Sequence, residues 1–410
     1  MHNPKPINKE GRNKMKKITS LVLLAWMGFL IPPAIFAEER NTDKRGEITG
    51  PISQGLYSKP VWRKMGHGTY VGGYADFEYR SKQDGKQKFE VLRMVPFIYG
   101  DIAPGLRFAT EIEFEHGGAT TKDEGDAKLE FAVLDYELAG EALAFRGGLV
   151  LIPLGKFNLI HDSPINDLND RPQVSRMILP STFFEPGAGF FGTVYPMDPL
   201  KLDYQFYLTQ GFNGGSNKNA NISSANGLRN ARSKVNGTGD NNENIAMTGR
   251  VAFSPFLGTE IGVSAHSGKW DDAGQESLNV YALDWGFQWK AIEFLGEYGN
   301  ADIARTTTTH TTIPGRMDGY YAQLNVHFLD DAVRKGSVFT GVVRWDHIDL
   351  DLLNQTSTQI NNSSQRLTFG LNFRPVEQTV FKIDYQINYE DLLRTKKDND
   401  AVVAGFATYF

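Results

Sequence analysis

The sequence predicts an all-β protein, a sixteen-stranded antiparallel β-barrel that spans a membrane. Apolar and polar residues alternate with a period of two in one segment after another, which is typical of strands whose two faces meet different environments. Short turns and long polar loops also alternate along the chain. The last segment, 401–410, keeps the alternation and ends on Phe410. A strand at the end of a chain needs a partner, and pairing with the first strand would close a barrel.

The N-terminal part of the chain predicts export and is set apart from the fold. Three lysines between positions 14 and 17 precede an apolar run at 18–30, and prolines and a small residue follow it. This pattern predicts a secretory signal peptide over residues 1–37. An uncleaved anchor is the alternative, because the apolar stretch approaches the roughly 20 residues that span a bilayer. Residues 38–69 are then a periplasmic lead-in, and residues 70–410 form the barrel.

Composition excludes several classes of function. Removal of residues 1–37, which hold six Lys or Arg and one Glu, changes the formal net charge from −5 to −10. An acidic chain without a basic tail lacks the electrostatic surface that nucleic-acid binding requires. The chain has no cysteine, which excludes disulfides, thiolate metal sites and a cysteine nucleophile. Mean hydropathy is −0.36, and a barrel can be this polar because its strands hide half of their residues from lipid.

Sixteen segments show the strand alternation. In the first segment Val71, Phe77 and Tyr79 share one phase, and Asp76 and Glu78 share the other. We expect the apolar phase to face lipid and the charged phase to face the lumen. The predicted strands span 70–80, 90–101, 105–116, 127–138, 142–152, 187–196, 200–211, 244–254, 257–268, 277–289, 291–300, 316–329, 336–348, 365–375, 378–390 and 401–410.

One predicted strand, 127–138, does not keep its phase. Its apolar residues change sides after Val133, and a β-bulge near that residue would reconcile the two halves.

The connections predict how the barrel is oriented. Tight turns at 101–104, 139–141, 196–199, 254–255 and 375–377 alternate with longer polar stretches at 117–126, 153–186, 212–243, 301–315 and 349–364. Barrels of the outer membrane have short periplasmic turns and long external loops. An even number of strands puts both ends of the barrel on the side of the short turns.

A soluble β-sandwich is the alternative to a membrane barrel, since it also shows alternation and regular turns. Aromatic residues favour the barrel because they gather at strand ends, as an interfacial girdle requires. They are Tyr79, Phe114, Tyr281, Trp289, Tyr298, Trp345 and Tyr389.

The number of strands predicts an aqueous pore, because eight strands fill their own interior whereas sixteen to eighteen leave a channel. The inward phase carries charges of both signs, which either pair with one another or bind a ligand. The predicted pore-lining residues are Arg107, Glu111, Glu113, Arg146, Arg250, Arg344 and Arg366.

The stretch 153–186 is the candidate for the constriction. It is long, yet it holds many apolar residues, which predicts a loop packed into the barrel mouth or at a subunit contact. Its candidate selectivity residues are Lys156, His161, Asp162, Arg171 and Arg176. The acidic residues here lack the spacing of a calcium loop, so no metal is predicted. By contrast, the Asn- and Gly-rich stretch 212–243 and the threonines at 306–312 predict mobile external loops.

No enzymatic motif is present, and neither an enzyme nor a cofactor is predicted. The chain lacks G-x-S-x-G, H-E-x-x-H and a P-loop, and Ser264 with His266 has only the ordinary spacing of one strand face. Two alternatives to a channel stay open: an outer-membrane hydrolase that uses this pair, and an adhesin that binds through the stretch 212–243.

Several stretches make the chain resemble the phosphate-selective porin O and P family of sixteen-stranded outer-membrane channels. They are 71–79, 96–101, 108–116 and, most specifically, the run Pro153 to Asp167. The resemblance implies a homotrimer in outer-membrane lipid, loops that fold into each pore, and a terminal aromatic, here Phe410, that the barrel-assembly machinery recognises. It also implies passage of small hydrophilic solutes or ions, such as the anion phosphate. The family's lysine cluster at the constriction has no match, because Lys156, Arg171 and Arg176 alternate with acidic residues.

Overall fold

The structure is a computed structural model, and it describes residues 69–116, 126–216, 219–232, 242–306, 313–353, 363–390 and 399–410. The predicted signal peptide and nearly all of the lead-in lie outside these residues, as do the threonines at 307–312. Within the described part of the chain, no helix is long and apolar enough to cross a membrane.

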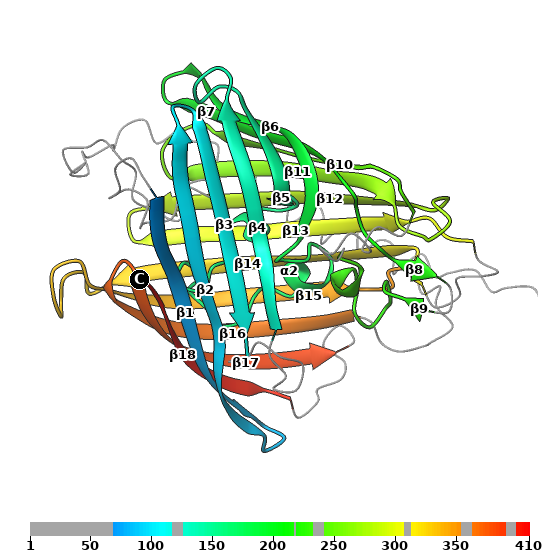
Figure 1. The fold of residues 1–410 in the computed structure, drawn as a ribbon. Helices are drawn as coiled ribbons and strands as arrows, with labels where there is room; N and C mark the ends of the chain where they lie inside the picture. The colour runs from blue at the N-terminus through cyan, green and yellow to red at the C-terminus, as the bar shows by residue number, and fades with distance from the viewer. Residues whose placement is uncertain are drawn as a thin grey trace, which may run out of the picture. The chain divides into compact units, whose positions relative to one another are not determined.

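The chain forms a closed antiparallel barrel of sixteen strands, which confirms the predicted fold class (Figure 1). Every predicted strand segment corresponds to a strand, with ends that differ by a few residues. The strands are β1 (Thr69–Lys82), β2 (Gln87–Ala103), β3 (Leu106–Glu115), β4 (Asp126–Glu137), β5 (Ala144–Leu151), β6 (Phe184–Met197), β7 (Leu200–Thr209), β10 (Ala246–Ser254), β11 (Thr259–Lys269), β12 (Ser277–Trp289), β13 (Ile292–Ile303), β14 (Arg316–Phe328), β15 (Val338–Asp349), β16 (Ser363–Val376), β17 (Thr379–Glu390) and β18 (Ala401–Tyr409). The short pair β8 (Gly215–Ser216) and β9 (Asn219–Ala220) forms a separate two-stranded sheet.

The first and last strands close the barrel. β1 pairs with β18 in antiparallel register from Tyr74 opposite Tyr409 to Lys82 opposite Ala401. The backbone of Phe410 extends this pairing, since its N–H donates to Gly73 (3.0 Å) and its carbonyl accepts from Gly73 (3.1 Å). The terminal segment therefore has the partner that its alternation requires.

The burial pattern is the inverse of that of a soluble protein. The charged phase of the strands is buried inside the barrel, as at Glu113 (0% exposed) and Glu297 (1%). The apolar phase is outside, as at Val263 (55% exposed) and Ile383 (50%). A sandwich would bury the apolar phase between its sheets, so this pattern excludes the soluble alternative. It provides an apolar belt for lipid and a charged lumen.

The predicted bulge in β4 exists, but it lies at Glu130 and not near Val133. The register of β3 on β4 shifts there, because Glu111 faces Phe131 while Ile112 faces Leu129. Phe131 and Val133 consequently point into the barrel and are buried. The sequence was misleading because the lumen of this barrel holds apolar side chains that contact a loop.

Two loops lie inside the barrel or against its inner contents. The first, residues 152–183 between β5 and β6, is here called the infolded loop, and it contains the short helices η3 (Phe157–Ile160) and α2 (Val174–Met177). The second, residues 210–216 and 219–232 after β7, is here called the second loop, and it contains η4 (Arg229–Ala231). The prediction that this second stretch is a mobile external loop is wrong for its described residues, because Ile222, Leu228 and Ala231 are fully buried.

Candidate constriction inside the barrel

The infolded loop leaves the barrel wall at Ile152 and returns to it at Phe183, and these two ends lie side by side in what is here called the neck. The backbone N–H of Ile152 donates to the carbonyl of Phe183 (2.9 Å). Asn158 strengthens this neck: its side-chain amide donates to the carbonyls of Ile152 (2.7 Å) and Phe183 (2.9 Å), and its oxygen accepts from the N–H of Phe183 (3.1 Å). All three bonds are buried, so Asn158 fixes where the loop enters the lumen.

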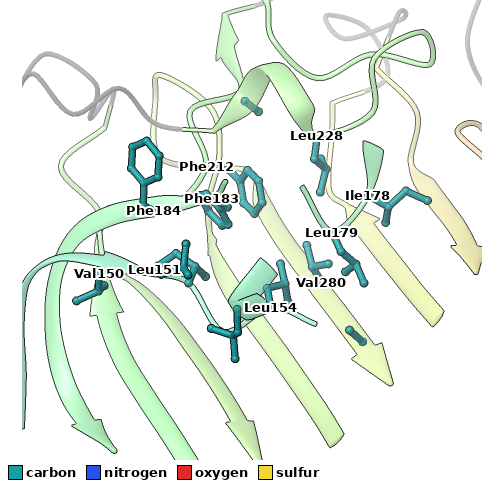
Figure 2. Packing of buried hydrophobic residues seen from close by; sticks show 14 of the residues in the cluster. Val150, Leu151, Leu154, Ile178, Leu179, Phe183, Phe184, Phe212, Leu228 and Val280 are labelled. Carbon is teal, nitrogen blue, oxygen red and sulfur yellow. The ribbon is translucent and has the colours of Figure 1, made fainter. Parts of the chain in front are cut away.

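One side of the infolded loop forms a hydrophobic core inside the barrel. Ile178, Leu179 and Phe183 are at most 1% exposed. Figure 2 shows these side chains together with Val280 of β12 and with Phe212 and Leu228 of the second loop. The rings of Phe183 and Phe212 stack with centroids 4.4 Å apart. This apolar packing explains the unusual composition of the loop, and it joins the two loops into one body.

The other side of the infolded loop presents its acidic residues to the wall. Asp162 accepts a hydrogen bond from the hydroxyl of Tyr409 (2.8 Å). Asp167 pairs with Arg374 (3.1 Å). Asp170 pairs with Arg80 and Arg366, at 2.7 and 3.2 Å. The wall therefore neutralises Asp167 and Asp170 by ion pairing and holds Asp162 by a hydrogen bond.

Asp170 shows how strong this neutralisation is. Burial alone would raise the pKa of Asp170, but the guanidinium groups of Arg366 and Arg80 hold it well below its ordinary value, and Arg176 adds to the effect. Its carboxylate is charged at any physiological pH.

Two further predicted selectivity residues are also held by carboxylates. Lys156 is half-buried, with its Nζ 3.1 Å from Glu260. His161 is buried, and its Nε2 contacts the carboxylate of Glu130, the residue of the β4 bulge. Its Nδ1 lies 2.7 Å from the carbonyl of Asn158. Lys156, His161 and Asp162 thus act as contacts between loop and wall.

The remaining two predicted selectivity residues belong to a different environment. Arg171 and Arg176 lie with Arg229 and Arg232 of the second loop in a cluster of four half-buried arginines, here called the arginine cluster. Arg171 donates to the hydroxyl of Ser181 (3.2 Å), and Arg232 donates to the carbonyl of the same serine (2.8 Å). Among the described residues, no carboxylate forms an ion pair with any of the four.

The pKa values of three members of the cluster are lowered mainly by burial, and the wall carboxylates Glu113, Glu115 and Glu130 offset this shift only in part. Burial lowers the pKa of Arg171 to about 10, and the charge of Arg93 adds to the shift. Burial together with the charges of Arg232, Arg176 and Arg171 lowers the pKa of Arg229 to about 10. Arg171 Nε and Nη2 and Arg229 Nη1 are buried donors that have no hydrogen-bond partner among the described residues. Such donors favour an anion or water between the two loops.

The predicted pore-lining residues take part in paired networks along the wall. Arg146 pairs with Asp135 (2.6 Å), and Arg250 pairs with both Asp284 (2.6 Å) and Glu260 (2.9 Å). The others contact as follows: Glu111 with Tyr99, Glu113 with Arg93 and Lys128, Arg344 with Asp346, Arg366 with Asp170, and Arg107 with Asp101 and Glu137. Arg107 differs from the other predicted pore-lining residues because its side chain is 46% exposed.

The Ser264 and His266 pair does not form a nucleophile and base. The Ser264 hydroxyl accepts from the backbone N–H of Gly155 in the infolded loop (2.9 Å). His266 Nδ1 lies 2.7 Å from the hydroxyl of Thr248. Both side chains therefore have structural partners, and a hydrolytic pair would need them bonded to one another.

Arg229 and Arg232 are the members of the cluster that sequence reasoning missed. They lie in a stretch dominated by Asn, Gly and Ser, which hid their role. The available signal was the spacing of Phe212, Ile222 and Leu228, which are apolar anchors that a solvated loop does not need.

Comparisons with known proteins support the fold. No family model matches the chain. An uncharacterized protein of Aquifex aeolicus (strain VF5) is 27% identical over 383 residues, which cover 88% of this chain and 83% of that protein.

Solved structures with similar folds are outer-membrane proteins. The outer membrane channel DcaP of Acinetobacter baumannii is 10% identical and covers 83% of this chain and 97% of its own, with a TM-score of 0.54. Salmonella typhi OmpF, solved with daunomycin, is 12% identical at the same coverage and TM-score. The anion-selective porin from Comamonas acidovorans is 10% identical and covers 83% of this chain and 99% of its own, with a TM-score of 0.54. At these identities the likeness concerns the fold alone.

Proposed function

We propose that the protein is a porin, a passive channel for small hydrophilic solutes and ions in the bacterial outer membrane. The observation that carries the proposal is a closed sixteen-stranded barrel with charged residues inside and apolar residues outside. A loop that enters such a lumen narrows it, and the groups at the narrowest point set selectivity. Transport of this kind has no chemical step and uses no cofactor.

We further propose that the channel prefers anions, with phosphate as one candidate. Asp167 and Asp170 of the infolded loop form ion pairs with arginines of the wall, whereas none of Arg171, Arg176, Arg229 and Arg232 forms a direct ion pair among the described residues. Nearby carboxylates, Asp170 and the wall residues Glu113, Glu115 and Glu130, offset the charge of the four only in part. Four positive charges without a direct ion-pair partner on loops inside the barrel favour anions over cations in the lumen. The Comamonas porin, whose name states anion selectivity, shows that this barrel fold can serve such a function.

The test is a recording in planar bilayers with the purified, detergent-solubilised protein. We expect discrete conductance steps, and in a potassium chloride gradient we expect a reversal potential on the anion side. Absence of any conductance from a folded preparation would remove the channel proposal. A cation-side reversal potential would remove only the anion preference.

The assembly and location of the protein are part of the same proposal. We propose export by the signal peptide over residues 1–37, a lead-in over residues 38–69, folding of residues 70–410 by the barrel-assembly machinery with Phe410 as the recognised end, and a homotrimer in outer-membrane lipid. Vibrio cholerae OmpT, a structure with the same fold, is described in a trimer form. Fractionation of cells and the mass of the detergent-solubilised complex test these statements.

A further inference from the structure

The boundary between β1 and β18, here called the seam, differs from the other strand boundaries of the barrel. Every other pair of neighbouring strands is joined by a turn or a loop of the chain, whereas β1 and β18 are the two ends of the barrel. Their pairing depends on backbone hydrogen bonds and on side chains across nine opposed residue pairs. Outside, Phe77 and Phe406 stack across the seam with centroids 4.7 Å apart.

The infolded loop contacts β1 from inside the barrel. The hydroxyl of Ser163 donates to the carboxylate of Asp76. Arg80 binds Asp170 through two parallel bonds, at 2.7 and 3.1 Å. Bidentate pairing between guanidinium and carboxylate is among the stronger polar contacts in proteins.

The same segment of the loop contacts the strands on the other side of the seam. Tyr409 of β18 donates to Asp162 (2.8 Å). Lys382 of β17 donates to the carbonyl of Ser163 (2.7 Å). The backbone N–H of Asn169 donates to Asp384 of β17 (2.6 Å).

Asp170 joins both sides through one carboxylate. Besides Arg80 of β1, it accepts from Gln386 of β17 (2.8 Å) and from Arg366 of β16 (3.2 Å). Arg80 lies on one side of the seam, and Gln386 and Arg366 lie on the other. All three side chains donate to the carboxylate of Asp170.

We propose that residues 161–170 of the infolded loop form an internal clasp that holds the seam closed. A barrel of this size can unfold by separation of its two end strands, because no covalent connection joins them. Within the clasp, Asp170 opposes that separation directly, since moving β1 away from β16 and β17 leaves a half-buried guanidinium or a half-buried carboxylate without its partner. This role is additional to narrowing the lumen and does not depend on which solutes pass.

The substitution Asp170→Asn tests the clasp, because it keeps the size of the side chain and removes its charge. Asp167→Asn is the matched control. Asp167 is also a half-buried loop carboxylate in an ion pair, but its partners Arg374, Asn372 and Asn325 all lie on β16 and β14, on one side of the seam. The readout is the rate of unfolding in hot SDS, followed by the change in gel mobility from the compact to the extended form.

Engineered cross-links locate the effect, and the absence of native cysteine makes them unambiguous. Ser81→Cys with Val402→Cys places two cysteines directly opposite one another across the seam. Val263→Cys with Leu283→Cys does the same across β11 and β12, far from the seam in the strand order. Opposed residues of antiparallel strands have Cα atoms about 4.5–5.5 Å apart, which is within the range for a disulfide.

We expect Asp170→Asn to unfold at least about tenfold faster than the parent protein. The seam cross-link should abolish this difference, and the β11–β12 cross-link should leave it intact. The effect of Asp167→Asn should be the same with either cross-link. The proposal is overturned if Asp170→Asn does not accelerate unfolding, or if the two cross-links protect it equally. Should Asp170→Asn fail to assemble, Arg80→Gln with the same pair of cross-links decides between these outcomes.

Discussion

Neutralising the arginine cluster should abolish most of the proposed anion preference, and the size of the effect can be worked from its four charges. At one Debye length, about 10 Å in 0.1 M salt, a unit charge in water contributes about 0.4 kcal/mol, and screening reduces this to about 0.15 kcal/mol. An anion gains this energy and a cation loses it, so each arginine changes the ratio of anion to cation permeability by a factor of about 1.7. Four charges together give a factor of at most about eight, because Asp170, Glu113, Glu115 and Glu130 offset part of their charge.

The variant for this test carries Arg171→Gln, Arg176→Gln, Arg229→Gln and Arg232→Gln. The measurement is its reversal potential in a tenfold gradient of potassium chloride across a planar bilayer. The control is the charge-neutral double variant Asp167→Asn with Arg374→Gln, which removes a half-buried ion pair between the same loop and β16 and leaves the net lumen charge unchanged. The control should keep the permeability ratio of the parent. A quadruple variant whose reversal potential equals that of the parent would refute the assignment of selectivity to the arginine cluster.

Three further predictions follow from the same structure. The anion preference should fall as the pH rises through about 10, because the depressed pKa values of Arg171 and Arg229 mean that their charge is present below that pH and lost above it; reversal potentials across a pH series check this. Asn158→Leu should release the neck of the infolded loop and lower the free energy of unfolding by about 1–3 kcal/mol for each buried group left without a hydrogen bond. We expect a larger single-channel conductance and loss of the parent's selectivity, and a conductance equal to that of the parent would contradict this role of Asn158. Deletion of Phe410 should reduce the amount of folded barrel in the outer membrane while leaving export intact, which fractionation and gel mobility measure; a normal yield would separate the terminal aromatic from assembly.

The strands were predictable because their environment imposes a simple rule on the sequence. A wall with lipid on one side and water on the other forces a period of two, and this period is visible at each strand without knowledge of its partners. The alternation with a period of two breaks at Glu130 and Phe131, where β4 has its bulge. The inner face of β4 contacts an apolar loop as well as water, so the polarity of the residues there no longer reports their side.

The constriction was only partly predictable for a related reason. The apolar content of 153–186 indicated a packed loop, but which of its charges remain uncompensated depends on contacts over long sequence distances. Asp170 meets Arg366, nearly two hundred residues later in the chain. Arg229 and Arg232 lie near Arg171 because Leu228 packs beside Met177, where the N–H of Leu228 donates a hydrogen bond to the carbonyl of Met177 (2.6 Å). No local sequence pattern connects these two segments.

The hydrophobic core beneath the infolded loop has a consequence for regulation. Seven of the loop's apolar side chains, Ile152, Leu154, Leu168, Val174, Ile178, Leu179 and Phe183, are at most 2% exposed. Moving them into water would cost more than about 10 kcal/mol at about 1.5 kcal/mol each, so fewer than about one molecule in ten million would have the loop displaced at any moment. In the proposed channel, the infolded loop is then a fixed constriction and not a gate that opens and closes. Permeability through the proposed channel would accordingly be set by the number of copies in the membrane and not by movement of this loop.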